Sequence, residues 1–333
     1  MKKILTITVP SYNVERFLEQ TLESFVDEQI LKDIEVLVVD DGSQDKTAEI
    51  GKKFAEEYPD TFRVISKKNG GHGSTINRGV MEASGKYFKV VDGDDWVYTE
   101  GLRELVCFLK ECDADYVFTN YYEVNDVTKE KKEVCFPGIP VYREFSFDKI
   151  AKTADIPMHA LVIRTALLRD HEIRLDEHCF YVDVEYILYP IPYVKSAVYY
   201  DIFVYMYRLA QAEQSVSMNG YQKHMQDHMK VILHVLDYID AYRTRKEADK
   251  RKIYYMERRI AEMVYTQTDI FTSFPTRQKG IRRQFREFDY MIKRKNQRVY
   301  QMSGSYSGML RLLRRTGFRL YTLTVMLSKW RNR

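Results

Sequence analysis

The sequence has 333 residues, 45% hydrophobic and 30% charged, which is the composition of a folded protein with room for about two domains and excludes bulk disorder. No run approaches the roughly 20 apolar residues of a membrane-spanning helix. The net charge of +4 is unevenly distributed, because residues 277–333 contain 16 basic and two acidic residues while the rest contains 36 basic and 46 acidic ones. This asymmetry predicts an anionic partner for the C-terminal segment.

Strand and helix patterns alternate through the first 120 residues. Helical spacing of apolar residues is found at 14–29, 47–58, 74–83 and 100–110, with Asn13 as the expected N-cap of the first helix. Strands are expected at 4–9, 35–39, 62–65, 86–91 and 116–119. Strict alternation of this kind predicts an α/β fold with a mostly parallel sheet and helices on both faces.

The pattern changes after residue 120. Five prolines interrupt residues 121–195, and residues 196–207 are extended and aromatic. From about residue 221 the spacing is helical, with segments at 222–242, 248–272, 281–302 and 308–330, and a Ser/Gly-rich hinge is expected at 303–308.

The N-terminal residues and the cysteines indicate the cellular compartment in which the protein is expected. Residues 1–9 carry charges and a short apolar run that ends at Pro10, which predicts a first strand and not a signal peptide. The four cysteines form no C-x-x-C pair, so reduced thiols in a cytoplasm are expected. We therefore expect a cytoplasmic protein, with a peripheral position on the inner face of the plasma membrane as a possibility that the basic tail raises.

Three polar clusters follow predicted strands, at residues 10–13, 40–43 and 92–95. Each alone is also typical of an Asp/Gly/Ser turn. Because ligands bind outside the carboxyl ends of strands in an open α/β sheet, we expect the three clusters to meet on one rim.

The third cluster places the carboxylates of Asp92, Asp94 and Asp95 within four residues. Uncompensated, they repel one another, and a divalent cation such as Mg²⁺ or Mn²⁺ would relieve this while keeping positions open for a diphosphate. The alternative is a solvated acidic turn.

A glycine-rich loop at residues 69–74 leads into a predicted helix, where backbone amides favour phosphate. It is not a dinucleotide fingerprint, since Ile76 stands where G-x-G-x-x-G requires glycine, and no P-loop motif occurs. Enzymes that use NAD and P-loop NTPases are therefore disfavoured.

The motifs VPSYN, VVDDGSQDKT, NGGHGSTINRG and GKYFKVVDGDDW, in this order, resemble the family 2 glycosyltransferases, which have the GT-A fold. The resemblance covers residues 3–120 strongly and continues more weakly to about residue 217. It implies a bacterial enzyme of cell-surface glycan synthesis, with a catalytic domain at 1–218 and a helical basic domain at 219–333. Within the former, residues 1–120 would bind the nucleotide-sugar and residues 121–218 the acceptor.

The resemblance also implies roles for nucleotide contacts. Pro10 and Tyr12 would line the base, with Tyr12 stacking on it, and Asp41 would accept a hydrogen bond from uracil. Further contacts are expected from the matching positions Ser11, Asn13, Gly71, His72, Asn77, Asp92, Gly93 and Arg208.

The D-x-D motif of the family corresponds to Asp92 and Asp94, with Asp94 and Asp95 expected at the metal. Asp183 matches the catalytic base that takes a proton from the acceptor hydroxyl in an inverting transfer. Its alternative role is a helix N-cap.

Two positions depart from the family pattern. The Arg-Asn pair that often follows the glycine loop here reads Ile76-Asn77, so diphosphate contacts would come from backbone amides, His72, Arg78 or Arg208. The Glu-Asp pair of the family reads Val182-Asp183, which retains the expected base and loses its acidic neighbour.

The basic tail has apolar residues interleaved with arginines over residues 308–330. This pattern is typical of a helix on an anionic membrane surface, and equally of helices that pack on the protein or on another subunit. Nucleic acid is disfavoured because no binding module accompanies the charge.

The sequence therefore predicts a metal-dependent inverting glycosyltransferase that uses Mn²⁺ or Mg²⁺ and moves sugar from a UDP-sugar to a glycan or lipid-linked acceptor. A catalytically degenerate binding or adaptor protein is the alternative. A nucleotidyltransferase ranks last, because such enzymes have a Gly-rich basic motif after the first strand, where this chain has Pro10-Ser11-Tyr12-Asn13.

Overall fold

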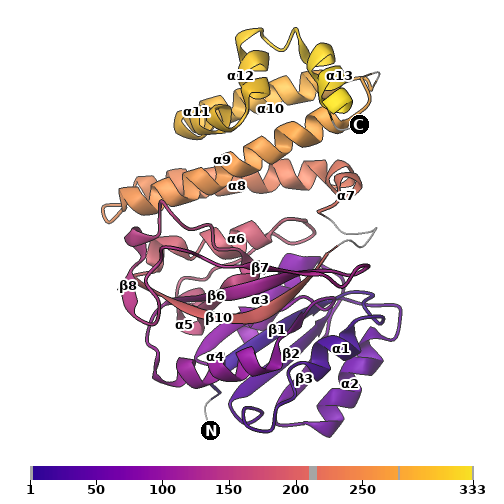
Figure 1. Cartoon of the computed structure of the whole chain (residues 1–333), viewed down its shortest axis with the longest axis vertical. Helices are drawn as coiled ribbons and strands as arrows, with labels where there is room; N and C mark the ends of the chain where they lie inside the picture. Colours follow the sequence, from indigo (N-terminus) through magenta and orange to yellow (C-terminus); the bar gives the residue numbers. More distant parts are fainter. Residues whose placement is uncertain (1–2, 210–215, 277, 332–333) are drawn as a thin grey trace. The chain divides into compact units, whose positions relative to one another are not determined.

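The computed structural model describes residues 3–209, 216–276 and 278–331, and the chain forms two compact units, residues 1–211 and 212–333 (Figure 1). The division falls seven residues before the domain boundary expected from the sequence. The roles expected for the parts of the first domain stay predictions at this stage.

A mixed sheet forms the centre of the first unit. Its strands within the described residues are β1 (Leu5–Ser11), β2 (Ile34–Asp40), β3 (Phe62–Ser66), β4 (Tyr87–Val90), β5 (Trp96–Val97), β6 (Tyr116–Asn125), β7 (Lys131–Val134), β8 (Glu144–Ser146), β9 (Leu161–Arg164) and β10 (Ser196–Leu209). They follow the order β3-β2-β1-β4-β9-β6-β10-β5, with β7 beside β6 and β8 beside β10.

The strand directions confirm the expected mixed, largely parallel sheet. β1 runs parallel to β2 and β4, β2 runs parallel to β3, and β6 runs parallel to β10. β9 is antiparallel to β4 and β6, and β5 is antiparallel to β10. Every residue of β1 is buried, as expected for a central strand covered on both faces.

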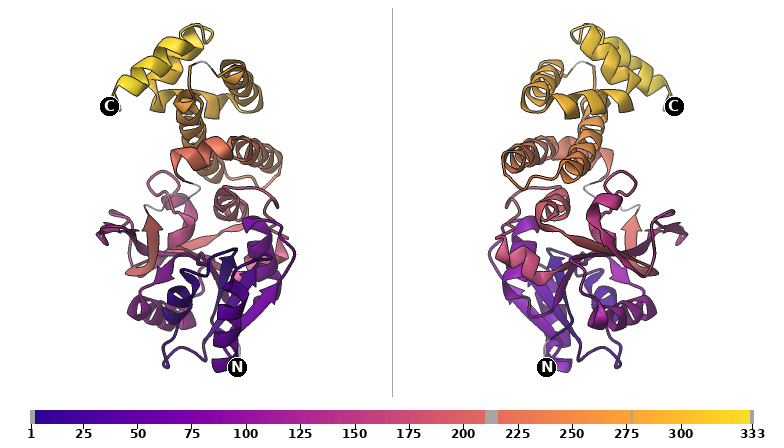
Figure 2. Two further views of the ribbon diagram at one scale, coloured as in Figure 1. Left: turned by 90° about the vertical axis from the view of Figure 1, so that its right-hand side faces the viewer. Right: turned by 90° about the vertical axis from the view of Figure 1, so that its left-hand side faces the viewer.

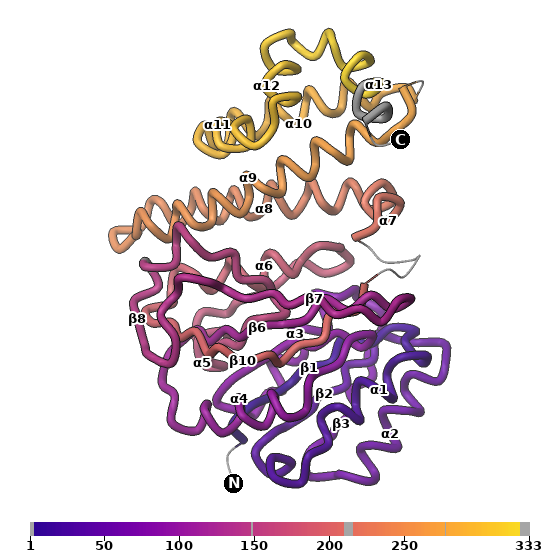
Figure 3. Tube along the Cα trace, viewed as in Figure 1, coloured from indigo at the N-terminus to yellow at the C-terminus, as the bar shows by residue number. Residues whose placement is uncertain are grey.

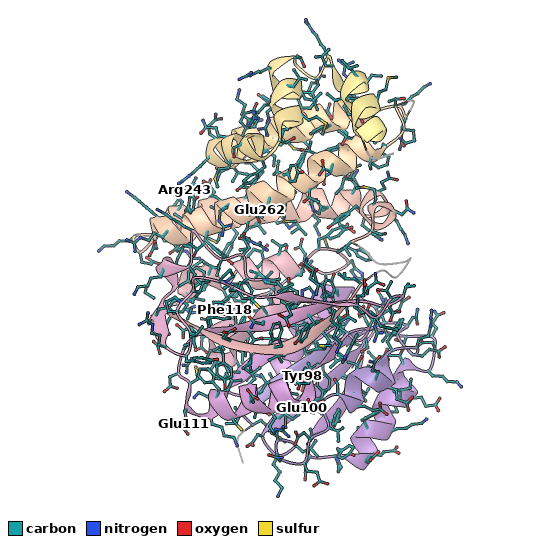
Figure 4. All side chains as sticks on the ribbon, viewed as in Figure 1. Tyr98, Glu100, Glu111, Phe118, Arg243 and Glu262 are labelled. Carbon is teal, nitrogen blue, oxygen red and sulfur yellow. The ribbon has the colours of Figure 1, made fainter. Side chains whose placement is uncertain are left out.

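Helices cover both sides of this sheet (Figure 2). They are α1 (Leu18–Glu23), α2 (Thr47–Glu57), α3 (His72–Glu82), α4 (Thr99–Glu111), α5 (Thr165–Asp170) and α6 (Asp183–Leu188). α3 packs on β1 and β2, α2 on β3, and α4 on β10. Figure 4 labels Glu100 and Glu111 near the two ends of α4.

Strand β3 forms one edge of the sheet. Its Arg63 is exposed and pairs with Glu35 at 3.8 Å and with Glu82 at 2.8 Å. The edge is thus five residues long and carries a charged side chain at its second position.

The second unit is helical. Its helices within the described residues are α7 (Met218–Lys223), α8 (Met225–Arg243), α9 (Lys250–Ser273), α10 (Ile281–Lys295), α11 (Gln297–Tyr306), α12 (Gly308–Arg315) and α13 (Tyr321–Arg331). α9 packs against α8, α10, α11 and α13, and Figure 3 follows the trace through these helices. No helix of the described residues is both long and apolar enough to cross a bilayer.

Buried charges tie these helices together. The Glu257 carboxylate of α9 accepts hydrogen bonds from Arg243 of α8 at 2.5 Å and from Asn296 at 2.9 Å. Arg314 of α12 donates to Asp289 of α10 at 2.8 Å and lies over the Tyr300 ring at 3.7 Å. Figure 4 labels Arg243.

Several expected boundaries were wrong. The helix expected at 14–29 is limited to α1, and Asn13 is not its N-cap: Asn13 has φ of 53°, its backbone N–H donates to Ser43, and its side chain accepts from the Gln44 N–H. The segment 281–302 breaks at Asn296, whose side chain caps α11.

The expected hinge at 303–308 is also wrong. Ser303 and Gly304 lie inside α11 and are buried, because their small size lets Arg314 approach: a Cβ on Gly304 would lie 2.8 Å from the Arg314 Nη1. The chain turns only at Ser307, which caps α12.

Candidate functional site

The three polar clusters meet on one rim, as the sequence predicts. The Asp41 N–H donates to the Ser11 carbonyl at 2.8 Å, and the Gly93 N–H donates to the Pro10 carbonyl at 3.0 Å. A Cβ on Gly93 would lie 2.9 Å from that carbonyl oxygen, so this close approach requires glycine. The carboxyl ends of β2, β1 and β4 are therefore joined directly.

Asp41 organises the glycine loop. Its buried carboxylate accepts hydrogen bonds from the Gly70 N–H through Oδ1 at 2.9 Å and from the Gly71 N–H through Oδ2 at 2.8 Å. Lys67 pairs with Oδ1 at 2.6 Å, and the sequence analysis did not single out this residue. Since a carboxylate oxygen has two acceptor directions, Oδ2 keeps one for a ligand.

The rest of the first cluster lies beside this loop. Tyr12 is 49% exposed, so its ring is available for stacking, whereas Ser11 is buried and donates to the Val9 carbonyl at 3.1 Å. The amide group of Asn13 is part of the link to residues 43 and 44 described above. The structure thus presents one exposed aromatic ring and several backbone groups at the end of the rim formed by residues 10–13.

His72 begins α3 and faces the acidic cluster. Its Nε2 lies 2.9 Å from Oδ1 of Asp92. Burial lowers the pKa of His72, but the charge and hydrogen bond of Asp92 outweigh burial and raise it overall. Burial likewise opposes ionisation of Asp92, and His72 still holds the pKa of Asp92 below its usual value.

The other two carboxylates of the cluster have raised pKa values. Burial, followed by the charge of Asp92, raises the pKa of Asp94 to about 6. Burial and the charges of Asp94 and Asp92 raise the pKa of Asp95 well above its usual range. Within the described residues, the carboxylate of Asp94 receives no hydrogen bond from another side chain, whereas that of Asp95 accepts from the Tyr205 hydroxyl at 2.6 Å and from the Arg208 N–H at 2.7 Å.

The structure adds residues that the sequence analysis missed. His159 lies in the short 3₁₀ turn Met158–Ala160, and its ring nitrogen and the carboxylates of Asp92 and Asp95 lie within 4.8 Å of one another. Its ring stacks on Tyr207 at 3.9 Å, and burial lowers the pKa of His159 to about 4. A lone histidine after a proline carries no sequence signal of such a position.

Arg208 is held firmly beside this cluster. Its Nε donates to the Asp94 carbonyl at 2.6 Å, its Nη1 to Asp126 at 2.8 Å and its Nη2 to Gln20 at 2.7 Å. The guanidinium also lies over the Trp96 ring at 4.5 Å. A phosphate contact would require these partners to rearrange, so the nucleotide role of Arg208 stays a prediction.

Helix α3 holds the segment that leads to Asp183. The side-chain amide of Asn77 donates to the Leu175 carbonyl and accepts from the Leu175 N–H, both at 2.9 Å. The His178 N–H donates to the Gly70 carbonyl at 2.5 Å. Asn77 thus fixes this segment, and its expected nucleotide contact remains a prediction.

Two glycines at the start of α3 let its backbone approach the segment at residues 175–178. Gly71 has φ of 82°, and a Cβ there would lie 3.2 Å from the His178 backbone. A Cβ on Gly73 would overlap the Asp176 carbonyl oxygen. Close approach of the two backbones therefore requires glycine at position 73.

Asp183 is the first residue of α6, and Val182 before it is fully buried. The charge of Asp183 contributes to the raised pKa values of both His72 and Tyr207. Asp183 therefore belongs to the same electrostatic cluster as Asp92 and Asp94, although about 90 residues separate them in sequence.

The donor set fits a divalent cation. Carboxylates are the ligands that Mg²⁺ and Mn²⁺ prefer, and the mutual repulsion that raises the pKa values of Asp94 and Asp95 is the kind that a cation relieves. Asp94 has its oxygens available for this role, and Asp92, Asp95 and His159 offer a group of closely spaced ligand atoms beside it.

Comparison with known proteins finds a family model that matches about half of the chain. Residues 6–169 match the model described as Glycosyl transferase family 2. Glycosyltransferase GlyA of Streptococcus pneumoniae is 38% identical over 122 residues, which are 37% of this chain and 17% of that protein. Poly(ribitol-phosphate) beta-N-acetylglucosaminyltransferase TarS of Staphylococcus aureus is 27% identical over 175 residues, 52% of this chain and 29% of TarS. The chain thus spans well under two thirds of the length of these relatives.

Solved structures share the fold. TarS residues 1–349 in complex with UDP-GlcNAc matches 99% of this chain and 92% of that chain with a TM-score of 0.64 and 19% identity. The mannosyltransferase PcManGT from Pyrobaculum calidifontis, in complex with GDP-Man and Mn²⁺, matches 98% of this chain and 87% of that chain with a TM-score of 0.50 and 12% identity. The chain has the GT-A fold.

Proposed function

We propose that this chain, whose residues 6–169 match the glycosyl transferase family 2 model, moves a sugar from a UDP-sugar to a hydroxyl of a cell-surface glycan or lipid-linked acceptor. The observation that carries the proposal is the convergence of Asp92, Asp94, His72 and Asp183 on one rim of a GT-A fold. The relatives add support: TarS is named for N-acetylglucosaminyl transfer to poly(ribitol phosphate), and its structure was solved with UDP-GlcNAc.

The donor would bind across the rim. The exposed Tyr12 ring would stack on uracil beside Pro10, and the free acceptor direction of Asp41 Oδ2 would take the uracil N–H. Ser11, Asn13 and Gly93 would border the nucleoside. The N-terminus of α3, with Gly71 and His72, would face the diphosphate, where backbone amides and a protonated imidazole favour negative charge.

Asp94 and Asp95 would hold Mn²⁺ or Mg²⁺, with Asp95 giving up one of its present hydrogen bonds. The ion would supply positive charge to the diphosphate as it leaves. Asp92 raises the pKa of His72 and orients its ring toward the same place, so the protonated form of His72 would add positive charge there.

Asp183 would act as the base of an inverting transfer. The acceptor oxygen would form its bond to the anomeric carbon as the bond from that carbon to UDP breaks, and the acceptor proton would pass to the Asp183 carboxylate. The contacts of Asn77 and Gly70 hold the segment of Asp183 against α3, which fixes the base relative to the donor side.

Calorimetry with UDP, with GDP as a control and with or without Mn²⁺, is the first test. We expect UDP binding that strengthens with the metal. Binding of GDP alone would overturn the uracil role of Asp41 and keep a glycosyltransferase. Absence of any nucleotide binding would instead support the non-catalytic adaptor that the Ile76 and Val182 departures suggest.

Two isosteric variants separate the roles of the carboxylates. Asp94→Asn should weaken the metal-dependent part of UDP binding and lower turnover, because it removes a charge at the diphosphate. Asp183→Asn should lower turnover by about 10²–10⁴-fold and leave UDP binding unchanged, since a general base contributes to the chemical step. Hydrolysis and transfer of a panel of UDP-sugars give the rates, and wild-type rates in both variants would rule out this mechanism.

A further inference from the structure

Helix α10 in the second unit has two chemically opposite faces. Ile281, Phe285, Phe288 and Ile292 point inward and are buried, and Phe285 stacks on Phe271 of α9 with ring centroids 4.5 Å apart. Helical spacing then places the remaining residues on the outward side.

The outward face is strongly basic. It spans a helix of 15 residues, about 22 Å long, and Glu287 is its one acid. Tyr290 lies near its middle and is 60% exposed. Its exposed basic side chains are Arg282, Arg283, Arg286, Lys293 and Arg294.

Some of these cations contact neighbouring groups. Lys293 lies over the Tyr300 ring at 5.6 Å, and Arg294 lies over the Tyr290 ring at 6.0 Å. Arg283 pairs with Glu287 at 2.7 Å. Across the described residues, no carboxylate oxygen lies within 4.0 Å of the side-chain nitrogens of Arg282, Arg286, Lys293 or Arg294. By contrast, Arg314 of the same unit is nearly buried on Asp289 and serves the packing of α12.

The structure divides the apolar residues of the segment 308–326, whose sequence pattern is typical both of a membrane-surface helix and of helices that pack on the protein. Leu310 and Leu313 of α12 and Val325 of α13 are fully buried. These apolar side chains form the interior of the unit, whereas Leu312, Leu323 and Met326 of the same segment are exposed. Among the described residues, α10 has four exposed basic side chains without a carboxylate oxygen within 4.0 Å, and α12 also has Arg315.

We propose that the outward face of α10 binds the surface of a membrane that contains anionic phospholipids. Charge complementarity favours an anionic partner, because each basic residue near anionic headgroups is attracted to them. Tyr290 favours a bilayer over a soluble polyanion. An exposed aromatic ring with a polar end is stabilised at the boundary between headgroups and acyl chains, whereas a polyanion in water would interact only with the basic charges.

Vesicle sedimentation with the full chain tests this proposal. The protein should bind vesicles of phosphatidylcholine with 30% phosphatidylglycerol, bind pure phosphatidylcholine much less, and lose binding at 0.5 M salt because screening shortens the reach of the charges. The triple variant Arg283→Glu/Arg286→Glu/Arg294→Glu should bind the anionic vesicles at least about 100-fold more weakly.

Matched control variants exclude two other causes of weaker vesicle binding, namely the change in net charge and the loss of guanidinium groups. A charge reversal of equal size on exposed residues of the first unit, Lys32→Glu/Lys52→Glu/Lys53→Glu, should bind like the wild type. Replacement of the three arginines by lysines should also bind, since headgroup attraction depends on charge and not on guanidinium geometry. Tyr290→Ser should weaken vesicle binding and leave binding to soluble polyphosphate unchanged.

Three results would overturn the proposal. The first is wild-type affinity of the Glu triple variant for anionic vesicles, and the second is equal binding of the wild type to neutral vesicles. The third is binding of polyphosphate as tight as that of anionic vesicles, together with unchanged vesicle binding in Tyr290→Ser. The last would assign the face to a soluble polyanion. UDP calorimetry on the same Glu variant should match the wild type. Failure of the membrane proposal and failure of the proposed enzyme are therefore read from separate measurements.

Discussion

The two units use buried charge differently. In the first, Asp94 and Asp95 are crowded together, and burial and mutual repulsion raise their pKa values. In the second, the buried carboxylate of Glu257 is paired with Arg243, and that of Asp289 with Arg314. The comparison teaches that several carboxylates crowded together mark the site where a ligand is expected, whereas a single carboxylate paired with an arginine marks a structural joint between helices, even where burial still raises its pKa, as at Asp289.

The largest effect on stability should come from breaking such a joint. Arg314→Met leaves Asp289 buried without its partner, and we expect the free energy of unfolding to fall by about 3–5 kcal/mol. Arg314→Met/Asp289→Leu should recover most of that loss. Urea unfolding followed by circular dichroism measures both, and a single variant as stable as wild type would show that the pair does not hold α12 in place.

A smaller effect, of up to about 3 kcal/mol, should come from a buried histidine of the second unit. Burial lowers the pKa of His228 to about 4, and its ring lies 2.8 Å from Gln267. Since the unfolded state binds the proton first, the contribution of neutral His228 is complete above about pH 6.5 and is lost as the pH falls toward 4.

The slope of stability against pH provides the measurement. The wild type should lose more stability between pH 7.5 and pH 5 than His228→Asn does, because the variant has no group that titrates at this position. Equal slopes would show that His228 is not held neutral in the fold. Titratable groups elsewhere contribute equally to the stability of both proteins, so their contributions cancel when the two slopes are subtracted.

The smallest effect we expect is at the contact that aligns Asp183. Gly73→Ala would push the Asp176 backbone away and cost about 1–3 kcal/mol, with a fall in turnover as the segment moves. Gly308→Ala is the control, because its Cβ would meet nothing closer than the Arg311 side chain at 3.7 Å. Unchanged turnover in Gly73→Ala would separate this contact from catalysis.

The sequence predicted the half of the fold whose pattern is local. Alternating apolar strands and helices up to residue 120 gave β1 to β4 and α2 to α4, and the position of acidic clusters after strands gave the rim. The antiparallel strand β9 was missed, because it is only four residues long and its three apolar residues are too few to show a strand period.

The site residues that the sequence analysis missed are those whose roles depend on side-chain contacts formed only in the folded chain. Lys67 lies in an ordinary charged stretch, and only the fold brings it to Asp41. His159 and Tyr205 reach the acidic cluster from elements far along the chain. The tail shows a further limit. Leu310 and Leu313 serve the interior of the second unit while Leu323 is exposed, and the amphipathic pattern alone does not predict which apolar residues are buried.

The edge of the sheet at β3 has a consequence for the behaviour of the protein at high concentration. An open strand edge is a template on which another chain can add a strand and start aggregation. Here the edge is short, and Arg63 places a charge on it that Glu35 and Glu82 hold in position. Strand addition would have to displace these ion pairs, so the arrangement that closes this side of the sheet also keeps separate molecules apart.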